Sequence, residues 1–266
     1  MKKYLGLALT LAAVVAAGAA PWLTPHDPLR ADFVQSLKPP GTPGHVLGTD
    51  QLGRDLLSRV LHGARLALFI GVCTVLVTAV VGGLVGLVAG FVERWPSAVL
   101  MRIADVQLSF PFILLALTIN AIVGLGLRNI ILSLSAAGWV VYARVVRGEV
   151  LSVKQRDFVH AAAALGVGRV RLLVRHVLPN VAPSIIVVAS LQFSQFIVAE
   201  AAISFLGFGI QPPTPAWGSM LSESRDFLYV AWWLGAFPGL ALAFTALGVN
   251  LLGDWLRDTF DPKLRV

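Results

Sequence analysis

The sequence has few charged residues and a single cysteine. Charged residues make up 13% of the 266 positions and hydrophobic residues 57%, a balance that would leave a water-soluble domain with far too much apolar surface. Cys73 lies inside an apolar run, so the chain can form neither an internal disulfide nor a cysteine-based metal site. The composition therefore indicates a membrane protein.

The motifs of several enzyme classes are also missing. The sequence contains no G-x-x-x-x-G-K-[ST] loop for ATP phosphates, no H-E-x-x-H pair for zinc and no G-x-S-x-G turn for a serine nucleophile. The five histidines fall in loops or at helix ends, where solvation or capping explains them better than metal binding: His26, His45, His62, His160 and His176. We therefore expect no catalytic, cofactor-binding or metal-binding residues in this chain.

Six apolar stretches are long enough to cross a membrane, which takes about 20 residues. They cover residues 4–23, 66–91, 103–123, 127–143, 181–205 and 230–252. Pro111 and Pro238 interrupt two of them, and we expect neighbouring helices to satisfy the freed carbonyl groups. The sequence therefore predicts an all-α membrane protein with six transmembrane helices.

Basic residues lie mostly on one side of these spans. With the N-terminus in the cytoplasm, fourteen of the 21 Lys and Arg residues fall inside and seven outside. Because short cytoplasmic loops are enriched in basic residues, this bias predicts that both termini are cytoplasmic. The inner group includes Arg94, Arg144, Arg147, Lys263 and Arg265, and the outer group is Arg30, Lys38, Arg54, Arg59, Arg65, Arg128 and Arg225.

The first span has two interpretations. Lys2 and Lys3 precede an apolar run, and the later Ala17-Gly18-Ala19 resembles the end of a cleavable signal peptide. The run continues from Tyr4 to Leu23, however, and the apolar core of a cleaved signal is usually about 7 to 15 residues long. We therefore expect an uncleaved first helix, whereas cleavage would leave five spans with unchanged orientations.

Two segments between spans are predicted on the outer side. Residues 24–65 are rich in proline and glycine, which indicates a loop rather than a folded domain. Within it, we predict a short amphipathic helix over residues 48–60. This helix either sets the direction of the second span or contacts substrate. Asp50 would cap this helix, Leu52, Leu56 and Val60 would form one face, and Asp55 would pair with Arg59.

The second outer segment, residues 206–229, is also rich in proline and glycine. Its turns precede aromatic residues of a kind that favours the headgroup boundary, so we expect them to anchor the chain there. A loop stiffened in this way could alternatively present a docking surface to a soluble partner. The aromatic residues are Trp217, Tyr229, Trp232 and Trp233.

A basic segment over residues 157–179 separates two apolar spans. From Arg144 to Arg175, seven basic residues accompany only Glu149 and Asp157, and the interleaved aromatic residues of a nucleic-acid groove are missing. Asp157 can cap a helix too short to span the membrane, which Gly166 would end. Its small apolar face would fit closely against a partner, or equally against the rest of the chain. This face would hold Phe158, Ala161, Ala162 and Leu165.

Several short motifs, in their order and spacing, resemble one family. Nine residues separate Gly166 from His176-Val177-Leu178-Pro179, which is similar to the "EAA loop" of ABC importer permeases. Further blocks resemble the dipeptide, oligopeptide and nickel branch of that family and extend over most of the chain: residues 45–59, 105–111, 199–207, 211–218 and 250–258. The loop begins His160-Ala161-Ala162 where the family usually has Glu-Ala-Ala, so no role of that carboxylate transfers to His160.

The resemblance implies a type I ABC importer permease in a bacterial inner membrane. Residues 1–65 would form an N-terminal transmembrane helix and an extracytoplasmic loop, and residues 66–266 the permease domain, with a cytoplasmic coupling loop at about 148–180. The implied partners are a second, different permease subunit, two ATPases that bind ATP and Mg, and an extracytoplasmic substrate-binding protein. The cargo would be a di- or oligopeptide, with nickel or another small solute as the alternative.

A stand-alone secondary transporter is the less favoured alternative. Such a protein would place charged groups deep in its spans. Only Asp105 and Glu200 come near this position, and we expect both at membrane interfaces.

Three groups of candidate site residues follow from the resemblance. Glu200 lies 21 residues after Pro179, about 30 Å along a helix, so Glu200 and Phe205 are candidates for an outer gate or for bundle packing. The alternative for Glu200 is a carboxylate that reaches the headgroups. The ATPase-coupling candidates are Asp157, His160, Ala161, Ala162, Leu165, Gly166 and Pro179, and the binding-protein docking candidates are Asp50, Gln51, Pro213, Thr214 and Trp217.

Overall fold

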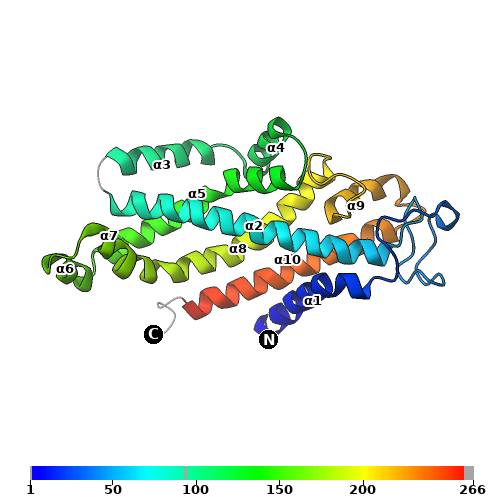
Figure 1. Ribbon diagram of the computed structural model, residues 1–266, viewed down its shortest axis with the longest axis horizontal. Helices are drawn as coiled ribbons and strands as arrows, with labels where there is room; N and C mark the ends of the chain where they lie inside the picture. Colours follow the sequence, from blue (N-terminus) through cyan, green and yellow to red (C-terminus); the bar gives the residue numbers. More distant parts are fainter. Residues whose placement is uncertain (1, 93–94, 261–266) are drawn as a thin grey trace.

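The computed structural model describes residues 2–92 and 95–260 and is a bundle of helices (Figure 1). In this described part of the chain, five helical stretches are long and apolar enough to cross a membrane. They contain α1 (Lys2–Leu23), α2 (Leu56–Phe91), α5 (Leu127–Lys154), α8 (Leu178–Phe205) and α10 (Trp233–Phe260). The predicted all-α membrane fold is therefore confirmed.

The predicted third span is broken. α3 (Trp95–Leu108) and α4 (Phe112–Val123) meet at a bend of 92°. Proline has no N–H donor and disfavours the helical conformation in the residue before it, so α3 ends ahead of Phe110, and Pro111 takes the N-cap position of α4. Within the described residues there are six membrane crossings only if these two helices together form one of them.

Other helices occupy the predicted positions but are longer than the predicted spans. α5 continues to Lys154, so Arg144 and Arg147 lie in this helix rather than in a loop after it. α2 continues across residue 65, where we had divided the chain, and α1 packs against both α2 and α10. Three residues of the predicted charge bias, Arg94, Lys263 and Arg265, lie outside the described residues.

α2 and α5 approach each other through a row of glycines. Gly82, Gly86 and Gly90 lie on one face of α2 because they are four residues apart. A Cβ atom on Gly82 would lie 2.2 Å from the carbonyl oxygen of Trp139, and one on Gly86 would lie 2.6 Å from that of Ala143. The two backbones can therefore touch only because these positions carry no side chain. The four-residue spacing of these glycines is visible in the sequence.

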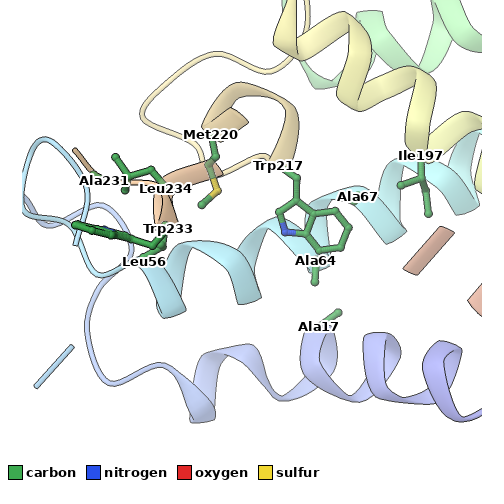
Figure 2. Packing of buried hydrophobic residues seen from close by; sticks show 10 residues of the cluster. All are labelled: Ala17, Leu56, Ala64, Ala67, Ile197, Trp217, Met220, Ala231, Trp233 and Leu234. Atoms are coloured by element: carbon green, nitrogen blue, oxygen red, sulfur yellow. The ribbon is translucent and has the colours of Figure 1, made fainter. Parts of the chain in front are cut away.

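One end of the bundle carries the loop of residues 24–55, with its short helix η1 (Phe33–Gln35), and also α9 (Trp217–Ser224) and η3 (Arg225–Phe227); we call it the loop end. Trp217 and Trp233 pack in its apolar core (Figure 2), where they are 2% and 6% exposed. The indole N–H of Trp217 donates to the carbonyl of Val60 at 3.0 Å. The expected headgroup role is therefore wrong for both tryptophans, while Tyr229 and Trp232 remain exposed.

Candidate functional site

The opposite end of the bundle, which we call the coupling end, carries the short helix α6 (Asp157–Ala164) (Figure 1). Val159 and Ala162 are buried in an apolar cluster formed with residues of α2, α5, α7 (Arg169–Leu172) and α8. The side chains of Phe158 and Leu165, by contrast, are 41% and 86% exposed. One face of α6 therefore fixes it to the bundle and another is open to a partner.

The predicted apolar face of α6 was only partly right. Ala162 belongs to the buried face, three residues from Val159, whereas Phe158, Ala161 and Leu165 are exposed. The predicted cap is wrong as well, because Arg156 holds the N-cap position and no side chain caps the helix. Asp157 lies in the first turn, where its negative charge interacts favourably with the helix dipole.

The predicted end of this helix at Gly166 is confirmed. Gly166 has φ = +80°, in the left-handed region that glycine adopts without steric cost. The N–H groups of Gly166 and Val167 donate to the carbonyls of Ala163 and Ala162, at 3.0 and 3.2 Å, which is the hydrogen-bond pattern of a Schellman motif. The turn satisfies the last carbonyls of α6 and redirects the chain toward α7.

Pro179 is the second residue of α8, which is continuous with the helical turns before it. α7, the π-helical turn η2 (Leu173–Val177) and α8 form one continuous helical stretch from Arg169 to Phe205, with Pro179 in the first turn of α8. A proline ring clashes with the carbonyl four residues earlier, here that of Arg175, and the wider π turn relieves this contact.

A groove of about 960 Å³ lies between α6, α7 and the end of α2. His160, at the position of the family's glutamate, is exposed and lines this groove together with Lys154 and Arg169. The groove therefore presents basic groups beside α6.

At the loop end, the predicted helix over residues 48–60 does not form. α2 begins only at Leu56, and its N-cap is Asp55, whose carboxylate accepts hydrogen bonds from the N–H and hydroxyl of Ser58 at 2.8 and 2.7 Å. Gly53 explains the difference, because it has φ = +72° and its position for a Cβ atom lies 1.7 Å from the carbonyl oxygen of Asp32. The chain therefore turns sharply where a helix was expected.

Asp50 is part of a buried ion network instead of a helix cap. Its carboxylate lies 2.6 Å from Arg54 and 2.5 Å from Arg59, and both arginines also contact Glu223 of α9, at 3.2 and 3.1 Å. Asp50 is 3% exposed and Arg59 1%. The network fixes the loop to α2 and α9, and it replaces the predicted pair of Asp55 with Arg59.

The docking candidates are only partly accessible. Asp50 and Trp217 are buried, because one pairs with two arginines and the other fills the core, so neither can contact a soluble partner. Gln51 is half-buried and donates to Glu223 at 3.3 Å. Pro213 and Thr214 are exposed, and they remain candidates.

Two histidines meet beside the start of α2. His45 Nδ1 lies 2.9 Å from Asp55 Oδ1, and the His26 ring stacks on that of His45 at 4.7 Å. Ligand atoms of His26, His45 and Asp55 lie within 4.8 Å of one another, a separation that could hold a metal ion. Because Asp55 already caps α2, His45 has a structural role in bracing that cap.

Glu200 and Phe205 lie in the last turns of α8, at the loop end. Glu200 is 2% exposed and accepts a hydrogen bond from the Ser204 hydroxyl at 2.7 Å. The Ser204 oxygen in turn accepts from the N–H of Ile210 at 3.0 Å, so Glu200 packs inside the bundle and does not reach the headgroups. The guanidinium of Arg225 lies 3.9 Å from the Phe205 ring centre and donates to its carbonyl.

Comparisons with known proteins identify the family. Residues 82–266 match the model of the "Binding-protein-dependent transport system inner membrane component". The chain is 44% identical to a di/tripeptide transport system permease protein of Pseudomonas aeruginosa, over 98% of this chain and 88% of the relative. It is 41% identical to a glutathione transport system permease protein of Pectobacterium atrosepticum, over 92% of this chain and 82% of that one.

A dipeptide transport system permease protein of Alkalihalophilus pseudofirmus is 39% identical over 98% of this chain and 85% of its own length. These similarities extend over nearly the whole chain, and the apolar helices agree with a multi-pass protein of the inner membrane. The chain therefore belongs to the inner-membrane component family of binding-protein-dependent transport systems, as a permease subunit of an ABC importer and not an enzyme.

Proposed function

We propose that this chain forms half of the translocation pathway of an ATP-driven importer of di- or oligopeptides. The observation that carries the proposal is the exposed apolar face of α6, in a basic segment between two membrane helices of a permease of this family. The relatives are named for the transport of dipeptides, tripeptides or glutathione, which favours a peptide over nickel as the cargo.

The coupling end would bind an ATPase. Exposed apolar side chains are ordinary where a helix faces lipid, but Leu165 and Val170, 86% and 77% exposed, lie in a polar segment where an uncovered apolar patch indicates a protein contact. Asp157, His160 and Ala161 are exposed on the same short helix. We place these residues against the ATPase, in which ATP and Mg would bind.

The connection of α6 to the bundle would carry the movement. Val159 and Ala162 pack against α5 and α8 at the coupling end, so a displacement of α6 by the closing ATPases would be transmitted to both helices. Gly166 sets the direction of the chain between α6 and α7, and Pro179 lies beyond the π turn in the same connection. These contacts support a coupling role for the segment 157–179.

The loop end would receive the soluble binding protein. Pro213 and Thr214 are exposed there, and the ion network around Asp50 holds the neighbouring loop rigid, so little entropy would be lost on docking. Glu200 and Phe205 close the end of α8 beside these loops, which supports a part in the outer gate. In this arrangement both termini lie in the cytoplasm, as the charge bias predicts.

The test is to purify the chain from cells that express the complete transporter. A second permease subunit, two ATPases and an ATP-dependent uptake of a radiolabelled dipeptide are expected. Purification without an ATPase would contradict the importer assembly. Assembly together with uptake of nickel but no peptide would contradict only the cargo.

A further inference from the structure

Two histidines and one aspartate converge on a single oxygen atom at the loop end. His45 Nδ1 lies 2.9 Å from Asp55 Oδ1, and His26 Nδ1 lies 3.9 Å from the same oxygen. The first distance is that of a hydrogen bond, whereas the second is too long for one. His26 therefore faces the carboxylate without a hydrogen bond to it, and the bracing of the helix cap by His45 leaves the position of His26 unexplained.

The separations suit a small metal ion. Zinc binds imidazole nitrogen and carboxylate oxygen at about 2.0 to 2.2 Å in a tetrahedral arrangement, which places the ligand atoms about 3.4 Å from one another. The two distances to Asp55 Oδ1 each differ from this value by about 0.5 Å. All three ligand atoms lie within 4.8 Å of one another, so small rotations of the two imidazole rings would complete the ligand set.

The Asp55 carboxylate has one oxygen available for a metal ion. Its Oδ2 accepts hydrogen bonds from the N–H and the hydroxyl of Ser58 at 2.8 and 2.7 Å and caps α2, while Oδ1 faces the histidines. The helix dipole disfavours a cation at the start of a helix, but the negative charge of Asp55 would offset this repulsion. The bonds to Ser58 also orient the carboxylate, which is what outer partners do at metal sites. Metal binding would therefore leave the cap intact.

The cluster is open to solvent on one side. The side chain of Asp55 is fully buried and that of His45 is 13% exposed, whereas that of His26 is 41% exposed. An ion can therefore reach the cluster past His26, and it can leave again without unfolding of the loop. Three protein ligands leave the fourth position of a tetrahedral zinc ion for water, which the exposed side of the cluster can supply.

A metal ion here would fasten a segment whose own hydrogen bonds are local. In the described part of the chain, the backbone hydrogen bonds of residues 26–31 stay within the segment, where the N–H groups of Leu29 and Arg30 donate to Asp27. The single cysteine of the chain excludes an internal disulfide, and a metal ion can close a long loop in its place. The ion would connect the chain just after α1 with the start of α2.

We propose that His26, His45 and Asp55 bind a Zn²⁺ ion, which fastens the loop of residues 24–55 to the start of α2. Imidazole nitrogens favour zinc and neighbouring transition ions, whereas magnesium and calcium prefer oxygen ligands. From the sequence we expected only solvation or capping for both histidines, because these residues are far apart until the loop folds. The inference goes beyond peptide import and does not depend on the cargo.

The first test counts the zinc bound to the complete transporter. The transporter is purified in EDTA, freed of the chelator and dialysed against a series of Zn²⁺ concentrations, and bound zinc is measured by atomic absorption. His26→Ala removes the exposed ligand but keeps the His45–Asp55 hydrogen bond and the cap. Loss of an outer partner already lowers the affinity of a metal site by about 10- to 100-fold, so loss of a ligand should lower it by at least about 100-fold.

The matched control is His62→Ala. His62 lies on the helix that Asp55 caps, but its Nδ1 lies 3.0 Å from the carbonyl of Ser58 and not in the cluster. This variant also removes a histidine from the start of α2, and it should bind zinc as tightly as the wild type does. Zinc bound by the other subunits is common to all three transporters and cancels in the comparison.

The second test asks whether the ion fastens the loop. Amide hydrogen exchange of residues 27–31 is measured with and without Zn²⁺, because exchange reports how often a segment opens. Saturating zinc should slow this exchange by at least about tenfold in the wild type and in His62→Ala. In His26→Ala, the same zinc concentration should leave the exchange rate unchanged.

The combined results decide the proposal. Zinc binding that depends on His26, together with slower exchange, supports it. Equal zinc affinity of the wild type and His26→Ala refutes the site, as does the lack of saturable zinc binding by the wild type. Binding that depends on His26 but leaves exchange unchanged refutes the fastening of the loop. If His26→Ala does not assemble, His26→Gln replaces it and gives the same outcomes, because its amide side chain is not among the usual ligands of zinc.

Discussion

Replacing Gly82 by alanine should separate α2 from α5. A Cβ atom at this position would lie 2.2 Å from the carbonyl oxygen of Trp139 and 2.7 Å from the Cβ atom of Tyr142. The first of these atoms is backbone within a helix and cannot rotate away. The adjacent Gly83 provides a matched control, because a Cβ atom there would meet only Ile185, at 3.9 Å, which is ordinary van der Waals contact.

The magnitude follows from the required movement. To reach 3.0 Å, below which Cβ contacts are essentially never found, the Trp139 oxygen must move by about 0.8 Å, and a gap of that size forfeits about a quarter to a half of each neighbouring dispersion contact. Overpacking of this kind costs about 1 to 3 kcal/mol, and the higher helix propensity of alanine offsets about 0.5 to 1 kcal/mol. We expect a net loss of about 1 to 2 kcal/mol in the free energy of unfolding.

Thermal unfolding of the purified chain in detergent measures this loss. For a chain of this size each kcal/mol corresponds to about 2 to 4 °C, so Gly82→Ala should unfold about 2 to 8 °C below the wild type. Gly83→Ala should unfold at or slightly above the wild-type temperature. Equal melting temperatures for the two variants would refute the close backbone contact between α2 and α5.

At the loop end, Asp50→Ala removes one buried partner from each of Arg54 and Arg59. It should lower the free energy of unfolding by about 3 to 5 kcal/mol. A loss below about 1 kcal/mol, the size typical of surface pairs, would contradict the network. At the coupling end, Leu165→Glu should reduce the amount of ATPase that co-purifies and leave the melting temperature of the chain unchanged. Ala162→Glu should lower the melting temperature, because Ala162 is buried. Identical behaviour of the two variants would show that the faces of α6 are assigned wrongly. Thr214→Cys in a Cys73→Ala chain should react with an impermeant thiol reagent from outside the cell, and binding protein should protect it; labelling from the cytoplasmic side alone would reverse the topology.

Local signals predicted the elements of this chain well. The apolar runs located the membrane helices, because the hydrocarbon thickness requires a minimum length of apolar sequence. The left-handed turn at Gly166 was also predictable, since it depends on one residue that tolerates positive φ and on two nearby carbonyls at the end of the same helix. Short motifs in a fixed order were sufficient to indicate the family.

Local reasoning failed where a residue had more than one partner to choose from. Asp50 and Asp55 could each cap a helix, and Asp55 is the cap because the chain turns at Gly53. That turn packs against the carbonyl of Asp32, which is distant in the sequence. Arg59 was assigned to Asp55, four residues before it, but it pairs with Asp50 and with Glu223 of α9. Sequence spacing cannot rank partners that lie in different elements.

Exposure was the other property that the sequence left undecided. Trp217 and Trp233 were expected at the headgroups, yet they fill the core of the loop end, because burial depends on which helices pack together and not on residue type. The same residue types on different faces of the bundle thus have different roles.

The sequence by itself determined that this chain is a multi-helix membrane permease with a short polar helix between two spans, because span length, glycine turns and motif order are local properties. Only the tertiary structure showed that α6 buries Ala162 and exposes Leu165. Only the tertiary structure brought His26 and His45 together at Asp55, because the path of a loop depends on contacts between residues that are far apart in the sequence.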